Sequence, residues 1–239
     1  MTLKNGRVAK DPRLGRIPQF DPQSKLFSVS KLFALVGQSP RSYTWDCPIV
    51  LDQGQEGSCV GHGIAHELAA RPAPVRGMTH QFARERIYWE AQKIDEWAGG
   101  SYPGASPVYE GTSVLAGVKV AKKLGYFDRY HWALSFDDFV LGVGYQGPSV
   151  IGVNWWSGMF EPDAQGFLHR TGSIEGGHCI LVVGVSINEQ AFTVHNSWGE
   201  SWGRRGRAKI SFADMRALLS DEGEACFFDG RHTVPKVTR

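Results

Sequence analysis

Apolar residues recur at helical spacing through the first half of the chain. From Ser58 onward, Val60, Ile64 and Leu68 share one helix face, and the prolines that follow residue 70 end the pattern. The same spacing predicts further helices over residues 79–95, 112–124 and 135–141. The pattern therefore favours a mainly helical region over residues 46–147.

After Pro148 the pattern changes to short runs rich in β-branched residues, separated by Gly and Asn. Such runs predict strands, and here they are SVIGVNWW, HCILVVGVSI, AFTVHNSW and GRAKIS. INEQ suits a hairpin turn between the second and third runs, and a last helix is predicted to begin at Ser211. Helices followed by strands indicate an α+β chain of two lobes with a cleft between them, the second lobe covering residues 148–239.

The segment before the first lobe, residues 1–45, is polar, with scattered Pro and Gly and weak periodicity. We expect it to form an extended N-terminal arm with one short helix around residues 29–35. The composition leaves open whether the arm is a propeptide or a permanent part of the fold, and whether it covers the cleft.

The composition is that of an ordinary globular protein, with 42% hydrophobic and 21% charged residues among 239. A net charge of +2 gives no argument for nucleic acid or a membrane surface as partner. The sequence has neither a transmembrane run nor an apolar stretch behind its basic start, so we expect no secretory signal. Four cysteines without CxxC spacing suit a reducing compartment and give no zinc ligand set. We therefore expect a cytoplasmic or virion-associated protein without metal or cofactor.

Cys59 is the candidate nucleophile because it stands where the first helix is predicted to begin. Free backbone N–H groups and the helix dipole favour a thiolate there, and a neighbouring histidine would lower the thiol pKa further. Gly54 and Gly57 give the preceding loop the freedom to approach a substrate closely. Gln53, six positions before the cysteine, could present its amide to a developing oxyanion, with the backbone N–H of Cys59 as second donor.

His178 is the candidate base. It follows two glycines at the start of an apolar strand, and the next predicted strand leads to Asn196. Antiparallel neighbours joined by a short turn can bring two such residues together, so Asn196 could orient the imidazole. Nucleophile, base and orienter form the arrangement that acyl transfer needs.

More ordinary interpretations exist for each of these residues. Free cysteines are commonly buried structural thiols, and a lone histidine at a strand end is usually structural. His62 and His66 lie at i+3 and i+7 from Cys59 on the same predicted helix, but should point away from its thiol. His195 should face the opposite side of its strand from Asn196.

Three ordered blocks, Q-G-x-x-G-S-C, G-H-C-I-L-V-V-G-V and H-N-S-W-G-x-x-W-G-x-x-G, resemble the papain-like cysteine peptidase family over roughly residues 45–230. The resemblance implies a papain-like two-lobe fold, with a helical left lobe and a β-barrel-like right lobe. It assigns Cys59 as nucleophile, Gln53 to the oxyanion hole, His178 as general base and acid, and Asn196 as orienter.

The resemblance also implies substrate-binding residues. Trp198 would shield the hydrogen bond between His178 and Asn196, with Trp202 behind it. The segment that contains Gly111 and Thr112 would bind substrate backbone by strand-like pairing. Two further residues that flank the base, Gly177 and Cys179, would line the pocket for the second residue on the acyl side.

The chain departs from the family at several points. Glu56 stands where a disulfide-forming cysteine is common, and Val60 where an aromatic residue usually follows the nucleophile. Both changes suit a non-secreted bacterial or phage branch. Only about fifty residues precede Cys59, which argues against regulation by a long, cleaved inhibitory prodomain.

The leading hypothesis is a peptidase that hydrolyses peptide or protein substrates through an acyl-enzyme on Cys59. A transferase that passes the acyl group to an amine would need the same residues. A non-catalytic binding or structural module, for example in a larger particle, is the third interpretation. The sequence does not choose an oligomeric state or a cleavage specificity.

Overall fold

The computed structural model describes residues 1–20, 26, 29 and 37–236, and these residues build one sheet of eight strands. The sheet order is β2-β8-β3-β5-β6-β7-β4, with β1 paired to β5, and its pairs are antiparallel except for β4 with β7. The strands are β1 (Tyr43–Thr44), β2 (Phe127–Trp132), β3 (Ser149–Trp156), β4 (Phe167–Leu168), β5 (Ile174–Ser186), β6 (Ala191–His195), β7 (Arg207–Ser211) and β8 (Glu224–Arg231).

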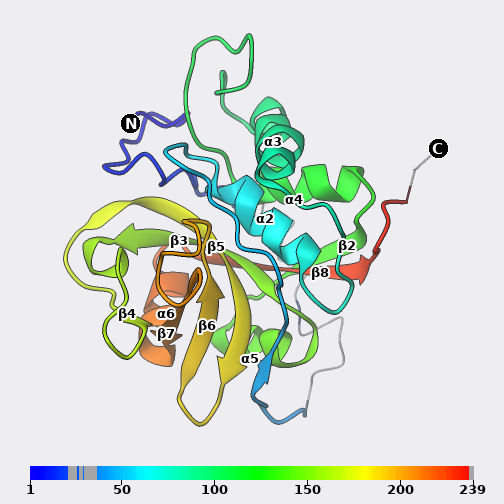
Figure 1. Ribbon diagram of the computed structural model, residues 1–239, viewed down its shortest axis with the longest axis vertical. Coiled ribbons are helices and arrows are strands. Elements are labelled where there is room, and N and C mark those ends of the chain that lie inside the picture. Colours follow the sequence, from blue (N-terminus) through cyan, green and yellow to red (C-terminus); the bar gives the residue numbers. More distant parts are fainter. Residues whose placement is uncertain (21–25, 27–28, 30–36, 237–239) are drawn as a thin grey trace.

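Helices cover the sheet in two groups. Those in the first group lie together at the top of Figure 1, and α5 and α6 lie with the lower strands. The first group comprises α2 (Cys59–Ala69), the π-helical η2 (Phe82–Tyr88), α3 (Trp89–Ile94) and α4 (Val114–Lys123). The others are α5 (Phe136–Tyr145), the 3-10 helix η3 (Ser157–Met159) and α6 (Phe212–Ser220).

Strand β5 separates two apolar cores. Alternate residues point to opposite faces of a strand, so Leu181 and Val183 pack into the core around α2 and α4. Their neighbours Ile180 and Val182 pack into the core around α5 and α6. Burial of both faces explains why this segment is a continuous apolar run rather than an alternating one.

The elements expected from periodicity are confirmed, with small shifts at their ends. Helix α2 begins at Cys59, and α6 is capped by Ser211, whose hydroxyl accepts a hydrogen bond from the backbone N–H of Asp214. The third helix begins two residues later than expected, because Ser113 caps it by accepting from the backbone N–H of Ala116. The expected α+β class is likewise confirmed, since helices and a large, mostly antiparallel sheet form one structure.

Strands β2 and β8 were not expected. β2 falls within the region predicted to be mainly helical, yet it pairs with β8 at the edge of the sheet. Its sequence FDRYHW alternates only weakly, since Asp128 and Arg129 are exposed and the remaining residues are buried or half-buried. The short helix expected around residues 29–35 falls largely outside the described residues.

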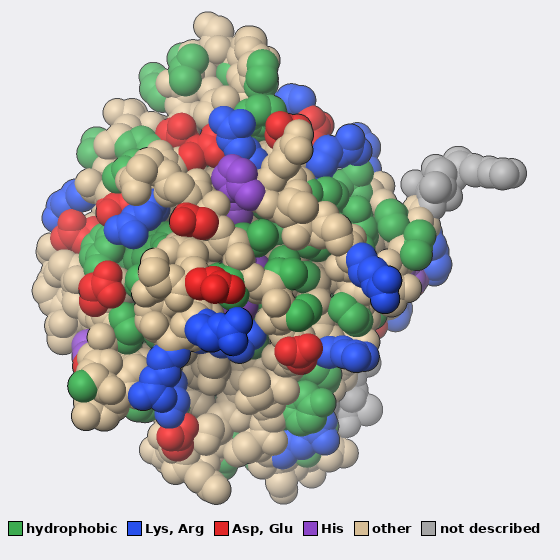
Figure 2. Space-filling view, in the orientation of Figure 1, with side chains coloured by type: hydrophobic (Ala, Val, Ile, Leu, Met, Phe, Trp, Pro, Cys, Tyr) green, Lys and Arg blue, Asp and Glu red, His purple; other side chains and the backbone are tan. Residues whose placement is uncertain are grey.

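Three further properties bear on function. No helix in the described part of the chain is long and apolar enough to cross a bilayer. Within the same residues, no group of three or more His, Cys, Asp or Glu side chains is placed to hold a metal ion. Lysine, arginine and carboxylate side chains are interspersed on the face that Figure 2 shows.

Candidate functional site

Cys59 is the first residue of α2 and is completely buried. Its sulfur receives backbone hydrogen bonds from Gly15 and from Cys179, the residue that follows His178. The predicted nucleophile therefore lies directly against the strand that carries the predicted base. Gly15 belongs to the N-terminal arm. None of the three sequence blocks that carry the family resemblance includes this segment.

The protonation state of Cys59 differs from the expectation of a lowered pKa. Burial raises the pKa of the Cys59 thiol to about 11, and the backbone hydrogen bonds that favour the thiolate only partly oppose this effect. Water is excluded partly because Gly15 lies on the sulfur. In this arrangement the thiol is neutral.

His178 and Asn196 form the predicted pair. His178 Nε2 lies 2.8 Å from Asn196 Oδ1, and the same oxygen accepts the backbone N–H of Ser197 at 2.8 Å. An oxygen that already accepts an N–H must accept from the imidazole as well, so His178 carries its proton on Nε2. Its Nδ1 is buried and has no hydrogen-bond partner among the described residues.

The imidazole is therefore neutral with one free lone pair. Burial is the main cause that lowers the pKa of His178 to about 4, and the hydrogen bond with Asn196 opposes it. An unprotonated Nδ1 is the form that a general base for a thiol requires. The arrangement of His178 and Asn196 matches the prediction from the strand pattern.

Three tryptophans surround the pair. The ring centroid of Trp198 lies 4.9 Å from that of His178. The ring centroid of Trp155 lies 4.7 Å from that of His178, in an edge-to-face contact. Trp202 packs edge-on behind Trp198 at 5.7 Å. The predicted positions of Trp198 and Trp202 agree with this geometry, and Trp155 adds a second shield that excludes water from the imidazole.

Gln53 is held by both ends of its amide. Its Oε1 accepts the Ser197 hydroxyl at 2.7 Å, and its Nε2 donates to the carbonyls of Arg13 at 3.0 Å and Glu56 at 2.7 Å. Ser197 thus fixes the direction in which the amide N–H groups point. The sequence reasoning did not single out Ser197, although it lies in the H-N-S-W block beside Asn196.

The predicted backbone-binding wall is formed by Gly111 and Thr112. Gly111 adopts a positive φ of 87°, and a Cβ there would lie 2.7 Å from the carbonyl oxygen of Gly15. The phenol of Tyr88 accepts the backbone N–H of Gly111 at 2.9 Å and holds the wall in place. Only glycine combines this backbone conformation with so close an approach of another chain segment.

That approaching segment is the arm, drawn in dark blue at the left of Figure 1 between the upper helices and the sheet. Thr112 donates its backbone N–H to Gly15 at 3.0 Å and accepts that of Ile17 at 2.9 Å. On the other side, Arg16 donates its backbone N–H to Gly177 at 3.0 Å. The arm therefore lies between the two predicted walls of the cleft.

Cys179 occupies a different place from Gly177. Both residues face the same side of β5, but the Cys179 sulfur packs against Gly63 of α2, deep in the apolar core. Burial raises the pKa of this second thiol well above its ordinary value. Cys179 thus reaches Cys59 through its backbone, and its side chain forms part of the core behind the cleft.

The rival histidines are engaged elsewhere. His62 Nε2 lies 2.9 Å from a nitrogen of His80, and His66 accepts the backbone N–H of Leu51 at 3.0 Å. His195 accepts a hydrogen bond from Arg207, and its ring centroid lies 4.3 Å from that of His66 with the two planes tilted by 53°. His62 also lies 2.9 Å from the carbonyl oxygen of Ser58, so each of these rings has partners other than Cys59 and Gln53.

Comparisons with known proteins relate the chain to cysteine proteases. The model of the papain family cysteine proteases matches residues 117–221, a range that contains His178 and Asn196 but begins after Gln53 and Cys59. The chain is 23% identical to an uncharacterized peptidase C1-like protein of Acanthamoeba polyphaga mimivirus over 74% of this chain and 68% of that protein. It is 24% identical to the cathepsin B-like protein CP2 of Giardia intestinalis, over 52% of this chain and 45% of that protein.

Solved structures share the fold. Xylellain, a cysteine protease from Xylella fastidiosa, matches with a TM-score of 0.69 at 16% identity, over 93% of this chain and 98% of that one. The procathepsin B S9 of Trypanosoma congolense matches with a TM-score of 0.54 at 15% identity, over 95% and 88% of the two chains. The ragweed pollen allergen Amb a 11, in its proform, gives 0.56 at 17% identity, over 95% and 76%.

Proposed function

We propose that this chain, which is papain-like both in its family match and in its fold, is a cysteine peptidase that hydrolyses peptide bonds through Cys59. One observation carries the proposal. His178 is held by Asn196 through Nε2, so that its unprotonated Nδ1 remains unpartnered, while the Cys59 sulfur lies against the backbone of the next residue, Cys179.

The proposed reaction starts when His178 Nδ1 takes the proton of the Cys59 thiol. The thiolate attacks the carbonyl carbon of a bound peptide, and the negative charge moves to the carbonyl oxygen. Gln53 Nε2 and the backbone N–H of Cys59 are the donors that would stabilise this oxyanion. Return of the proton from His178 to the leaving amine breaks the C–N bond and leaves a thioester on Cys59.

Water then completes the cycle. His178 takes a proton from a water molecule, which attacks the thioester and releases the acid product and the thiol. The same residues would serve a transferase, in which an amine replaces water. Analysis of the products with and without an added amine, such as glycine amide, tells the two reactions apart, and we expect the acid product to dominate in both.

The nucleophile can be tested in the full chain with a thiol-directed epoxide probe. Cys59→Ala should abolish both probe labelling and cleavage of a peptide library, because the proposed reaction has no other nucleophile. Cys47→Ala is the matched control, since Cys47 is also a buried free thiol, and it should keep both signals. Labelling that survives Cys59→Ala and disappears in Cys47→Ala would remove Cys59 from its role.

A further inference from the structure

The loop that precedes Cys59 is held in place without a covalent link. All four cysteines are free thiols, and Glu56 stands where the family resemblance implies a disulfide-forming cysteine. Its carboxylate instead forms an ion pair with Arg84 of η2 at 2.8 Å. The next residue, Gly57, is buried and donates its backbone N–H to Glu110 Oε2 at 3.1 Å. The loop is thus anchored once through a side chain and once through its backbone.

The peptide group between Glu56 and Gly57 contacts the proposed oxyanion donor. Its carbonyl oxygen accepts Gln53 Nε2 at 2.7 Å and the backbone N–H of Ser58 at 2.8 Å. Its N–H, on the opposite edge of the same group, is the one that donates to Glu110. Because a trans peptide group is planar and rigid, holding its N–H also fixes the direction of its carbonyl.

The side-chain amide of Gln53 depends on that direction. Its Nε2 carries two hydrogens, of which one is donated to the carbonyl of Glu56 and the other to that of Arg13. In the proposed reaction the substrate oxygen takes the place of the Arg13 carbonyl, while the Glu56 carbonyl keeps the first hydrogen. The hydroxyl of Ser197 holds the other end of the amide, Gln53 Oε1. The peptide group and Ser197 together therefore set the plane of the amide.

Glu110 is itself held by a buried phenol. Tyr88 is 0% exposed, and its O–H donates to Glu110 Oε2 at 2.8 Å. The phenol oxygen accepts Gln92 Nε2 and the backbone N–H of Gly111, each at 2.9 Å. With its one donor and both acceptor positions used, the phenol has a single orientation. The Glu110 oxygen is thus kept where it meets the N–H of Gly57.

We propose that Glu110 is a positioning residue that acts through the Glu56–Gly57 peptide group to hold Gln53 Nε2 where the oxyanion forms. The proposal rests on the peptidase function above. Glu110 would not contact the oxyanion, because the peptide group and the amide lie between them. The side chain of Glu56 has a different role, since its carboxylate leads to Arg84 rather than to this peptide group.

The position of the Glu110 oxygen should matter more than its charge. Burial raises the pKa of the Glu110 carboxyl, as does the nearby Glu56, and the hydrogen bonds from Tyr88 and Gly57 and the charge of Arg84 oppose this effect. A neutral amide oxygen could accept the same O–H and N–H groups without a buried charge. Glu110→Gln should therefore preserve the arrangement, whereas Glu110→Asp, one methylene shorter, should draw the oxygen away from Gly57.

The first experiment measures steady-state cleavage of a peptide amide by the full chain. Removal of an oxyanion donor typically lowers kcat by about 10²–10³-fold, and Glu110→Ala should cause part of this loss, about ten- to a hundredfold. KM should change by less than about threefold, because the contact is made in the transition state. Glu110→Gln should stay within about threefold of the starting kcat, and Glu110→Asp should lose at least about fivefold.

Alkylation of Cys59 by iodoacetamide separates positioning from general damage. Alkylation needs the thiol and His178 but forms no oxyanion, so its rate in Glu110→Ala should stay within about threefold of the starting rate while kcat falls. A fall in alkylation as large as the fall in kcat would overturn the proposal. If Glu110→Ala does not fold, the two other variants decide, and a Glu110→Asp chain as active as Glu110→Gln would overturn it.

A double-mutant cycle tests the path through Gln53. Gln53→Ala alone should lower kcat by about a hundredfold or more. Adding Glu110→Ala to that chain should lower kcat by less than about threefold further, because no amide remains to be positioned. Two full losses that multiply would mean that Glu110 acts by another route, and the proposal would be wrong.

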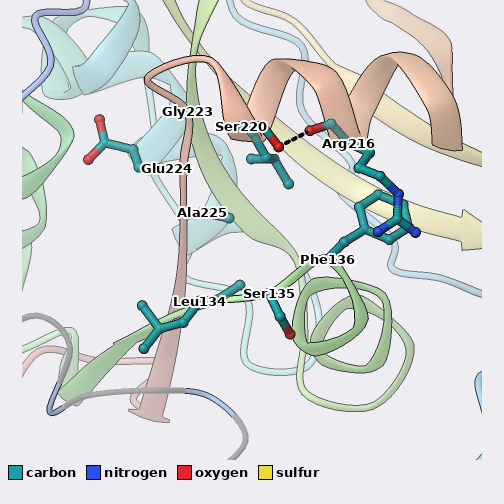
Figure 3. Close-up of a pocket in the computed structure, with 10 residues that line it drawn as sticks. Leu134, Ser135, Phe136, Arg216, Ser220, Gly223, Glu224 and Ala225 are labelled. Carbon is teal, nitrogen blue, oxygen red and sulfur yellow. Dashed lines mark hydrogen bonds between the residues drawn. The ribbon is translucent and has the colours of Figure 1, made fainter.

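Two controls remove contacts elsewhere. Arg84→Met breaks the partly exposed ion pair with Glu56 on the same loop but leaves the peptide group in place, so kcat should change by less than about threefold. Ser220→Ala removes a hydrogen bond to the carbonyl of Arg216 at 2.8 Å, which Figure 3 marks beside a pocket at the end of α6, and should leave kcat unchanged. A loss in Arg84→Met as large as that in Glu110→Ala would overturn the specific role of Glu110.

Failure of this inference differs from failure of the proposed function. An unchanged kcat in Glu110→Ala, or a higher KM with the starting kcat, would separate Glu110 from the oxyanion donor and leave the peptidase intact. Absence of cleavage by the starting chain, together with an unlabelled Cys59, would instead refute the peptidase.

Discussion

Strand β8 carries one partner of each of two buried ion pairs. Near its start, Glu224 meets Arg16 of the arm at 2.8 Å, and at its end, Arg231 meets Glu67 of α2 at 2.7 Å. Burial raises the pKa of both carboxyls, and an arginine opposes the effect in each case. The two pairs are alike in chemistry, but their partners belong to different kinds of segment.

Glu67 and Arg231 join a helix to the sheet, and no step of the proposed reaction would separate them. Arg16 instead belongs to the arm, which bonds to Thr112 and Gly177 and, under the proposed function, would have to leave before a peptide could reach Cys59. The ion pair of Glu67 and Arg231 thus joins two parts of the framework, whereas the pair of Arg16 and Glu224 holds a segment that would have to move. The contrast implies that the stability lost on breaking a buried pair depends on whether water can reach the remaining charge.

The largest effect should come from the framework pair. Arg231→Met leaves the Glu67 carboxylate buried without a cation, and we expect the free energy of unfolding to fall by about 3–5 kcal/mol. Urea unfolding of the full chain measures it. Arg129→Met is the control, because Arg129 pairs with Asp229 of the same strand at the surface and should lose less than about 1 kcal/mol. Equal losses of unfolding free energy in Arg231→Met and Arg129→Met would show that burial of the ion pair does not determine the loss.

Two buried histidines, His178 in the cleft and His195 in the framework, give the second prediction. Burial lowers the pKa of His178 in the cleft to about 4 and that of His195 in the framework to about 3. Because a folded pKa below the unfolded value of about 6.5 favours folding above that pH, His178 contributes stability that is lost as pH falls from about 6.5 to 4. At pH 5 the loss should be about 2 kcal/mol.

Displacement of the arm should change only one of the two histidines. A Cβ on Gly15 would overlap the carbonyl of Gly57, so Gly15→Val should displace the arm and let water reach His178. The pKa of His178 should then rise towards about 6.5, and its share of the acid destabilisation should shrink. His195 should keep its low pKa, since the arm does not cover it. NMR titration of the histidine rings measures both values, and parallel shifts of His178 and His195 would show that the variant loosens the whole fold.

The ion pair of Arg16 and Glu224 gives the third prediction. Arg16→Met should weaken the seating of the arm and raise the rate of peptide cleavage about tenfold, which corresponds to about 1.4 kcal/mol. The free energy of unfolding should fall by less than in Arg231→Met, because water can enter beside Glu224 once the arm moves. A loss as large as that of Arg231→Met, without a gain in rate, would place Arg16 in the framework.

Much of this arrangement could be predicted from local sequence patterns. The helix that begins at Cys59 and the strands that carry His178 and Asn196 follow from apolar periodicity, and a short hairpin suffices to bring β5 and β6 together. Strand β8 was missed because its partners, β2 and β3, are distant in sequence. Pairing of that kind is decided by the tertiary fold rather than by local propensity.

The position of the arm and its ion pair with Glu224 could not be predicted in the same way. Residues 1–20 have weak periodicity, and their order comes from hydrogen bonds to Gly177 and Thr112, which no local pattern reveals. The ion pair of Arg16 with Glu224 spans 208 positions. The neutral thiol of Cys59 also depends on where the arm lies in the tertiary fold. A helix start lowers the pKa of a thiol only where water or a cation can reach the sulfur.

The smallest effect should come from the side chain of Arg13. Its guanidinium lies 4.0 Å from the centre of the Trp198 ring, a cation–π contact worth about 0.5–1 kcal/mol at a partly exposed site. Arg13→Met removes this contact but keeps the carbonyl that accepts the Gln53 amide, so the arm should be released only slightly. We expect a two- to fivefold rise in the rate of cleavage of a neutral peptide, measured beside Arg129→Met, whose ion pair joins β2 to Asp229 of β8 at the surface. An increase as large as that of Arg16→Met would mean that Trp198, rather than Glu224, holds the arm, and would weaken the contrast between the two buried pairs.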